Sequence, residues 1–141
     1  MLKLILPAAA VTLAACVAHA GASRQDTPTA AEQRALTEGR AIGKPQSCVT
    51  IRQIRDTDAI SDRVVLFHMK NGRTYRNDLP NSCPQLARDG SAFGFSTPIG
   101  SLCAIDTIQV TEPSSGFAYG GCQLGKFTRY ELPQGLHRNS F

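Results

Sequence analysis

Four cysteines in the C-terminal part of the chain most constrain what it can fold into. They are Cys48, Cys83, Cys103 and Cys122. A bond between any two of them closes a long loop and lowers the entropy of the unfolded chain. Disulfide bonds are the expected use of such cysteines in an exported domain, and metal binding is the alternative. No two form a Cys-x-x-Cys pair and none is spaced from a histidine as in a zinc finger, so no metal or other cofactor is expected.

The N-terminus has the layout of an export signal. Lys3 provides one positive charge, and residues 4–15 that follow are uncharged and mostly apolar. A transmembrane helix needs about 20 apolar residues, so this run is too short to span a bilayer, and Pro7 weakens it further. Residues 1–15 are therefore predicted to be a lipoprotein signal peptide that is removed on export.

Two cleavage sites follow the apolar run. The triplet AHA at residues 18–20 fits ordinary signal peptidase, whereas LAAC at residues 13–16 resembles the lipobox of bacterial lipoproteins. The lipobox is the more specific match, so Cys16 is the expected lipid attachment site and a membrane the expected partner. In bacterial lipoproteins an Asp after that cysteine favours the inner membrane, and here Val17 follows it. The expected location is the periplasmic leaflet of the outer membrane.

Residues 16–47 are predicted to form a flexible tether with a short helix. The segment is rich in Ala, Thr, Gln, Gly and charged residues, so it has little apolar surface to bury. Thr29 and Glu32 have the spacing of a capping box, in which each side chain bonds the backbone N–H of the other. The helix is expected from about Ala30 to Glu38.

Residues 48–132 are predicted to form a single small antiparallel β domain, which makes the fold class mainly β. Turn signals recur along the segment and bound five or six short strands. The clearest element is a hairpin of residues 64–69 and 73–79, with Asn71-Gly72 as a type I′ turn. Residues 133–141 are expected to fray as a tail.

Several stretches of this domain resemble a family of small proteobacterial lipoproteins classed as a domain of unknown function. The likeness covers about residues 48–127 and includes an Asn-Gly hairpin and three cysteine motifs. The matching stretches are CVTIRQIRD, LFHMKNGRTYRNDLPNSCPQL, LCAIDTIQV and CQLGKF. The resemblance implies export, often lipidation, and a domain that carries disulfides. It implies no activity.

The four cysteines allow three pairings. The predicted pairs are Cys48–Cys122 and Cys83–Cys103. Cys48 opens the first expected strand and Cys122 the last, so antiparallel closure of one sheet would bring both to the same margin. Cys83 and Cys103 flank the expected strand that contains Phe93, where a loop of about 20 residues closes readily.

Charge excludes some partners and suggests others. The net charge is +4, and export removes only Lys3 from the basic residues. No basic run interleaved with aromatic residues is present, so a nucleic-acid partner is not expected. Six basic residues could share one face that binds an anionic envelope polymer: Arg52, Arg55, Arg63, Arg73, Arg76 and Lys70. The alternative is a solvated face neutralised by Asp56, Asp58, Asp62 and Asp78.

Two residues are candidates for chemistry. His68 could act as a general base with Asp78 or Asp106, although a single histidine in an apolar strand is more often structural. Asp106 stands among apolar residues, where a buried carboxylate must be paired. The expected role of Asp106 is an ion pair that fixes strand register. Its candidate partners are Arg52, Arg55, Arg73 and Arg76.

The sequence contains no convergent set of acid, base and nucleophile. The predicted function is therefore a non-enzymatic envelope lipoprotein that binds an envelope component or a partner protein. Two alternatives stay open. One is a small periplasmic enzyme that uses His68 with an Asp, and the other is an inhibitor that inserts residues 114–121 into a target enzyme.

Overall fold

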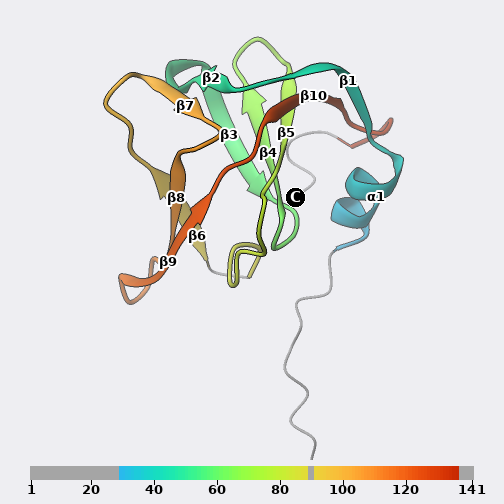
Figure 1. Ribbon diagram of the computed structural model, residues 1–141. Coiled ribbons are helices and arrows are strands. Elements are labelled where there is room, and N and C mark those ends of the chain that lie inside the picture. Colours follow the sequence, from blue (N-terminus) through green and yellow to red (C-terminus); the bar gives the residue numbers. More distant parts are fainter. Residues whose placement is uncertain (1–28, 89–90, 137–141) are drawn as a thin grey trace, which may run out of the picture.

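The computed structural model describes residues 29–88 and 91–136 of this chain, and Figure 1 shows the arrangement. The predicted signal peptide and lipid attachment site, Cys16, lie outside the described residues. The fold is mainly β, as predicted. The elements are α1 (Ala30–Glu38), β1 (Arg40–Gln46), β2 (Cys48–Thr50), the 3-10 helix η1 (Ile51–Gln53), β3 (Ile54–Ala59), β4 (Val64–Met69), β5 (Thr74–Asp78), β6 (Ala92–Phe95), β7 (Ser101–Cys103), β8 (Thr107–Glu112), β9 (Phe117–Gln123) and β10 (Phe127–Glu131).

The strands form three antiparallel sheets. The largest has the order β1-β10-β5-β4-β3, and the other two have the orders β2-β7 and β6-β8-β9. In Figure 1 the three-stranded sheet lies on one side of the five-stranded sheet and α1 lies on the other. The described residues form ten strands, whereas five or six were expected. The number is higher because several predicted strands are divided into two.

The predicted hairpin is confirmed, but its turn type is wrong. β4 and β5 pair in register, with His68 opposite Thr74. The amide of Met69 donates to the carbonyl of Arg73, and the amide of Gly72 donates to the carbonyl of Met69. The loop therefore has three residues, and within it only Gly72 has a positive φ, at 82°. Such a loop has a left-handed glycine at its end, whereas type I′ needs two consecutive left-handed residues.

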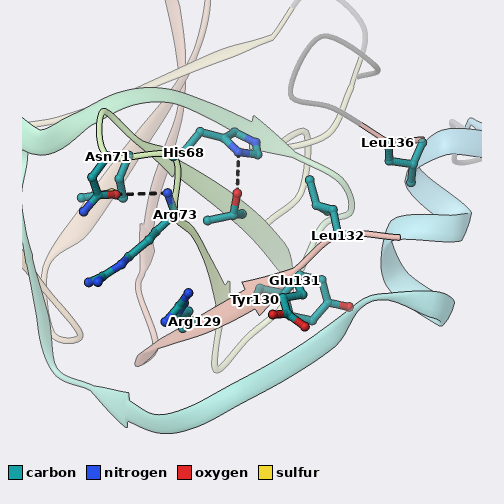
Figure 2. Close-up of a pocket in the computed structure, with 11 residues that line it drawn as sticks. His68, Asn71, Arg73, Arg129, Tyr130, Glu131, Leu132 and Leu136 are labelled. Carbon is teal, nitrogen blue, oxygen red and sulfur yellow. Dashed lines mark hydrogen bonds between the residues drawn. The ribbon is translucent and has the colours of Figure 1, made fainter. Parts of the chain in front are cut away.

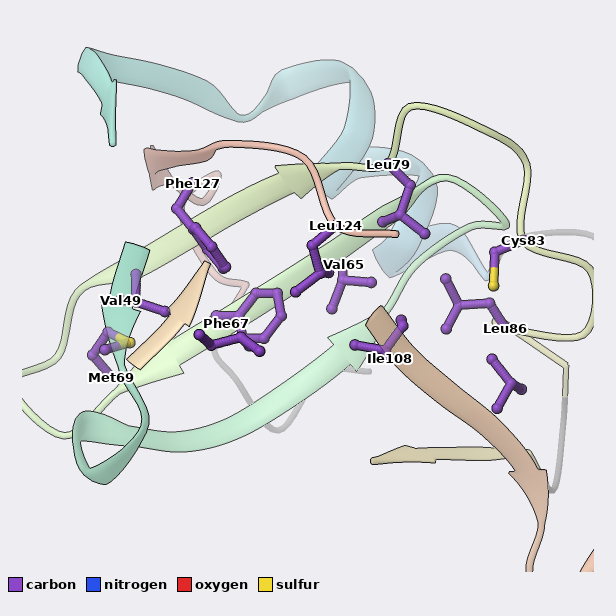
Figure 3. Packing of buried hydrophobic residues seen from close by; sticks show 12 residues of the cluster. Val49, Val65, Phe67, Met69, Leu79, Cys83, Leu86, Ile108, Leu124 and Phe127 are labelled. Atoms are coloured by element: carbon purple, nitrogen blue, oxygen red, sulfur yellow. The ribbon is translucent and has the colours of Figure 1, made fainter. Parts of the chain in front are cut away.

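β4 is buried on both faces and separates two apolar clusters. Val65, Phe67 and Met69 contribute to the larger cluster, which also contains Ile108 and Val110 of the three-stranded sheet. Figure 3 shows this packing, with Phe67 and Phe127 in an edge-to-face contact at 5.2 Å between ring centroids. The larger cluster thus joins the sheets to one another.

The opposite face of β4 packs against α1. Leu66 belongs to a smaller cluster with Ala35 and Tyr130, and the Tyr130 hydroxyl donates to the carbonyl of Ala35 at 2.8 Å. Side chains alternate along a strand, so His68 lies on this α1 face with Leu66. A Cβ on Gly39 would collide with the Tyr130 ring, so glycine there lets the chain pass close to β10.

The prediction of a flexible tether is therefore partly wrong. The helix has the predicted bounds, and Thr29 and Glu32 form both bonds of the capping box. After it, however, β1 pairs with β10 and forms an edge of the five-stranded sheet. Residues 30–46 thus belong to the folded domain, because Ala35 and the β10 edge supply partners that local sequence does not reveal.

The C-terminal part also differs from expectation. Most of residues 114–121, the segment that an inhibitor would insert into its target, belong to β9, which pairs with β8. Residues 133–136 of the expected tail form a turn that packs Leu136 against the smaller cluster, while residues 137–141 lie outside the described residues. These segments gain order from partners on other strands.

The predicted disulfide pairing is wrong. The bonds join Cys48 to Cys103 and Cys83 to Cys122. Cys48 and Cys103 are directly opposite in the β2–β7 pair, with Cα atoms 4.0 Å apart. Cys122 lies on β9, opposite Ile108 of β8 in the three-stranded sheet, whereas Cys48 lies on β2 in the two-stranded sheet, so the strands that carry Cys48 and Cys122 do not pair.

Candidate functional site

A cavity of about 520 Å³ lies at the end of the β4–β5 hairpin. Its walls come from the hairpin, from β10 and from the turn that follows β10, and Figure 2 shows the lining side chains. Those with functional groups or apolar surface are His68, Asn71, Arg73, Thr74, Arg129, Tyr130, Glu131, Leu132 and Leu136. The cavity thus combines an apolar end, at Leu132 and Leu136, with a polar end at the hairpin.

A buried hydrogen-bonded series reaches the cavity wall. The His68 ring is 2% exposed, and its Nε2 lies 2.7 Å from Oδ2 of Asp58 while its Nδ1 lies 2.9 Å from the Thr74 hydroxyl. A carboxylate accepts hydrogen bonds only, so Nε2 carries a proton. In neutral His68 the Thr74 hydroxyl then donates to Nδ1. Every polar atom of the imidazole ring is therefore satisfied.

The acid that pairs with His68 is not one of the two predicted. Asp78 stands opposite Val64, at the other end of β4, and bonds Arg76 at 2.7 Å. This hydrogen bond raises the pKa of Arg76 above its ordinary value, so Arg76 remains cationic. Asp58 bonds His68 instead. It lies on the neighbouring strand β3, opposite Leu66, and Leu66 is two residues from His68 on the same face of β4.

The predicted ion pair of Asp106 is also wrong. The Asp106 carboxylate accepts the backbone N–H of Cys103 at 2.7 Å, and the Asp106 amide donates to the carbonyl of Cys103. No ion pair of Asp106 occurs within residues 29–88 and 91–136. The carboxylate therefore closes the turn between β7 and β8, a common role for Asp in turns.

Two arginines give the polar end of the cavity its charge. Arg73 and Arg129 are both exposed, and Figure 2 shows them at the end of the cavity away from Leu132 and Leu136. Arg129 stands opposite Tyr75 of β5, and Arg73 lies two residues before Tyr75, just outside that strand, so both arginines lie near the hairpin end of the sheet. Neither forms an ion pair among the described residues.

Among the described residues that line the cavity, the one carboxylate belongs to Glu131, and a different arginine bonds it. Arg40, directly opposite on β1, donates to Glu131 at 2.8 Å. This bond raises the pKa of Arg40 above its ordinary value. The charge of Glu131 is thus matched locally by Arg40, which leaves the positive charge of Arg73 and Arg129 in excess at the cavity.

The six basic residues expected on one face do not all gather together. The backbone of Lys70 bonds the carbonyl of Gln53, so the hairpin end lies beside η1 and the neighbouring Arg52. Arg63, however, lies at the opposite end of β4, where its carbonyl accepts from the Leu79 amide. Arg76 is bonded to Asp78. The basic region is therefore confined to the hairpin end.

Sequence reasoning missed Asp58 as the partner of His68, and it missed Arg129 and Tyr130 in the cavity wall. Asp58 lies on β3, directly before β4 in the chain, whereas Arg129 and Tyr130 lie on β10, which neighbours the hairpin in space but not along the chain. One local signal was present for Asp58, since Asp56 and Asp58 alternate with apolar or small residues as on one face of a strand. No local signal indicated that β10 would stand beside β5.

The described residues contain no group of three or more His, Cys, Asp or Glu side chains arranged to hold a metal ion. Within the same ranges no helix has the length and apolar character needed to cross a bilayer. Comparison with protein-family models, with curated proteins and with solved structures gave no match to this chain.

Proposed function

We propose that this chain is an exported, non-enzymatic lipoprotein, anchored through Cys16, whose β domain binds a ligand in the cavity at the hairpin end. The observation that carries the proposal is the cavity itself. It joins an apolar wall to two arginines that form no ion pair among the described residues, a combination typical of ligand sites. Its walls are held by the buried His68 series and by α1, so the site is preformed.

Binding is favoured over catalysis because His68 and the hydroxyl that it bonds are both buried. His68 is 2% exposed and Thr74 is 9% exposed. A nucleophile that an imidazole activates must also reach the substrate. Here the imidazole links β3, β4 and β5, which is a structural role in the wall of the site.

The anchoring part of the proposal is tested through Cys16. Cys16→Ser should move the protein from the membrane fraction to the soluble fraction or leave an uncleaved precursor, because the modified thiol is lost. Radiolabelled palmitate should label the wild-type protein and not the variant. An unlabelled wild-type protein would exclude the lipoprotein, and density-gradient fractionation checks the expected outer-membrane location.

The binding part is tested on lipoprotein extracted from membranes in a neutral detergent. Native mass spectrometry should detect a co-purified small ligand on the wild-type protein. Leu136→Trp, which adds bulk to the cavity wall, should remove it, whereas Phe117→Trp changes an exposed side chain outside the cavity and should keep it. A cavity that holds nothing in either protein contradicts the proposal.

A second candidate is a small hydrolase, and one observation favours it. Thr74, His68 and Asp58 follow the order hydroxyl, imidazole, carboxylate, in which an imidazole activates a nucleophile. The test is hydrolysis of p-nitrophenyl acetate by the wild type and by Thr74→Val. A turnover that Thr74→Val abolishes would favour the enzyme, and an equal background rate in both excludes it for this substrate.

A further inference from the structure

Among the described residues, the side chains at the hairpin end of the cavity are mainly hydrogen-bond donors. Arg73 and Arg129 line it without an acidic partner among the described residues, and Glu131 is bonded to Arg40. Asn71 uses its side-chain oxygen to accept the backbone N–H of Arg73 at 3.1 Å, which leaves its NH₂ group as a donor. A ligand that fits this end must therefore supply several acceptors and negative charge.

From this donor set we infer that the cavity binds a phosphate monoester, with the phosphate on Arg73 and Arg129. This inference rests on the proposed binding function and names its ligand class. Two guanidinium groups and an amide offer more donors than the two oxygens of a carboxylate can accept, whereas a phosphate has three charged or polar terminal oxygens. Arginine also matches phosphate through paired N–H groups.

The geometry supports a shared phosphate. Both arginines line the cavity, and Arg129 stands opposite Tyr75, two residues after Arg73, so two long side chains can reach one group there. The rest of the ligand would then occupy the remaining volume of the cavity. The phosphate belongs either to a soluble metabolite or to a lipid headgroup.

The test measures thermal stabilisation of the full lipoprotein in neutral-detergent micelles, since a ligand of the folded state raises the melting temperature. The soluble probe is glucose 1-phosphate, with glucose as its uncharged control. The lipid probe is phosphatidic acid in the micelles, with phosphatidylcholine as its control. Stabilisation by glucose 1-phosphate identifies a soluble source, and stabilisation by phosphatidic acid alone identifies a headgroup.

Three variants locate the phosphate. Arg73→Gln and Arg129→Gln should each weaken binding roughly tenfold or more, because each removes a charge-assisted donor. Arg63→Gln removes the same charge from an exposed position at the opposite end of β4 and should bind like the wild type. Since all three positions are exposed, the ligand-free melting temperatures should agree.

Two results overturn the inference. One is the absence of stabilisation by either phosphate probe, and the other is equal binding by the wild type and both cavity variants. If native mass spectrometry then still finds a neutral ligand that Leu136→Trp removes, the binding function stands and only the phosphate fails. If the cavity is empty in the extracted protein, both the binding function and the phosphate ligand are contradicted.

Discussion

At the scale of single residues, His68 is the most constrained polar group of the site. Its ring is buried between Asp58 on β3 and Thr74 on β5, and it is the point at which three strands are linked by side chains. A buried N–H that loses its partner costs about 1–3 kcal/mol, because it cannot bond water instead. The contribution of His68 to the free energy of unfolding can therefore be measured by substituting its hydrogen-bond partners.

Asp58→Ala should lower the free energy of unfolding by about 1–3 kcal/mol, because it leaves Nε2–H of His68 without an acceptor. Urea denaturation followed by circular dichroism measures the change. The matched control is Asp56→Ala, on the same strand and the same face but exposed, which should stay within about 0.5 kcal/mol of the wild type. Equal losses in both variants would mean that the His68–Asp58 bond contributes nothing specific.

At the scale of elements, α1 depends on its cap and on one strand. The helix has nine residues, a length at which an isolated helix is marginal in water. Two features hold it: the capping box at Thr29 and the contact of Ala35 with Tyr130. Because α1 covers the face of β4 that carries His68, the stability of α1 affects the cavity wall.

Thr29→Ala should destabilise the protein by about 1 kcal/mol, since it removes the acceptor for the Glu32 amide. Thr37→Ala is the control within the same helix: its hydroxyl is exposed and bonds only the carbonyl of Gln33, and alanine favours a helix. In thermal unfolding, the melting temperature of Thr29→Ala should therefore be lower than that of the wild type, and that of Thr37→Ala should be close to it. The reverse ranking would show that the cap does not stabilise α1.

At the scale of the whole molecule, the two disulfides join different parts of the fold. Cys48–Cys103 joins β2 to β7 within one small sheet and is partly exposed at Cys48. Cys83–Cys122 joins the segment after the hairpin to β9, and Cys83 is fully buried. Their sequence separations are 55 and 39 residues, so the chain-entropy model assigns each about 4 kcal/mol.

Burial should make the two bonds unequal. Cys83→Ser with Cys122→Ser should lower the melting temperature more than Cys48→Ser with Cys103→Ser, because it also places a hydroxyl in the apolar core. Partial reduction and mass mapping should release peptides joined as Cys48–Cys103 and Cys83–Cys122. Peptides joined as Cys48–Cys122 would contradict the structure, and an equal loss of melting temperature would contradict the role of burial.

The features that could be predicted from the sequence are those set by interactions between residues close together in the chain. The hairpin and α1 were predictable because their signals are local: Gly72 permits a left-handed turn, and Thr29 bonds an amide three residues away. The mainly β class follows from the same short-range alternation of apolar residues. The turn type of the hairpin was missed because one loop sequence is compatible with loops of two or three residues.

The pairing of segments that are distant in the chain could not be predicted from local sequence. Part of the expected tether is the strand β1 because it pairs with β10, and Cys48 faces Cys103 because β2 pairs with β7. Likewise His68 bonds Asp58 and not Asp78, because register across β3, β4 and β5 decides which side chains meet. Arg129 reaches the cavity only because β10 adds to β5. Local alternation shows which residues turn inward, whereas the partners they meet depend on strand order, which the free energy of the whole core selects.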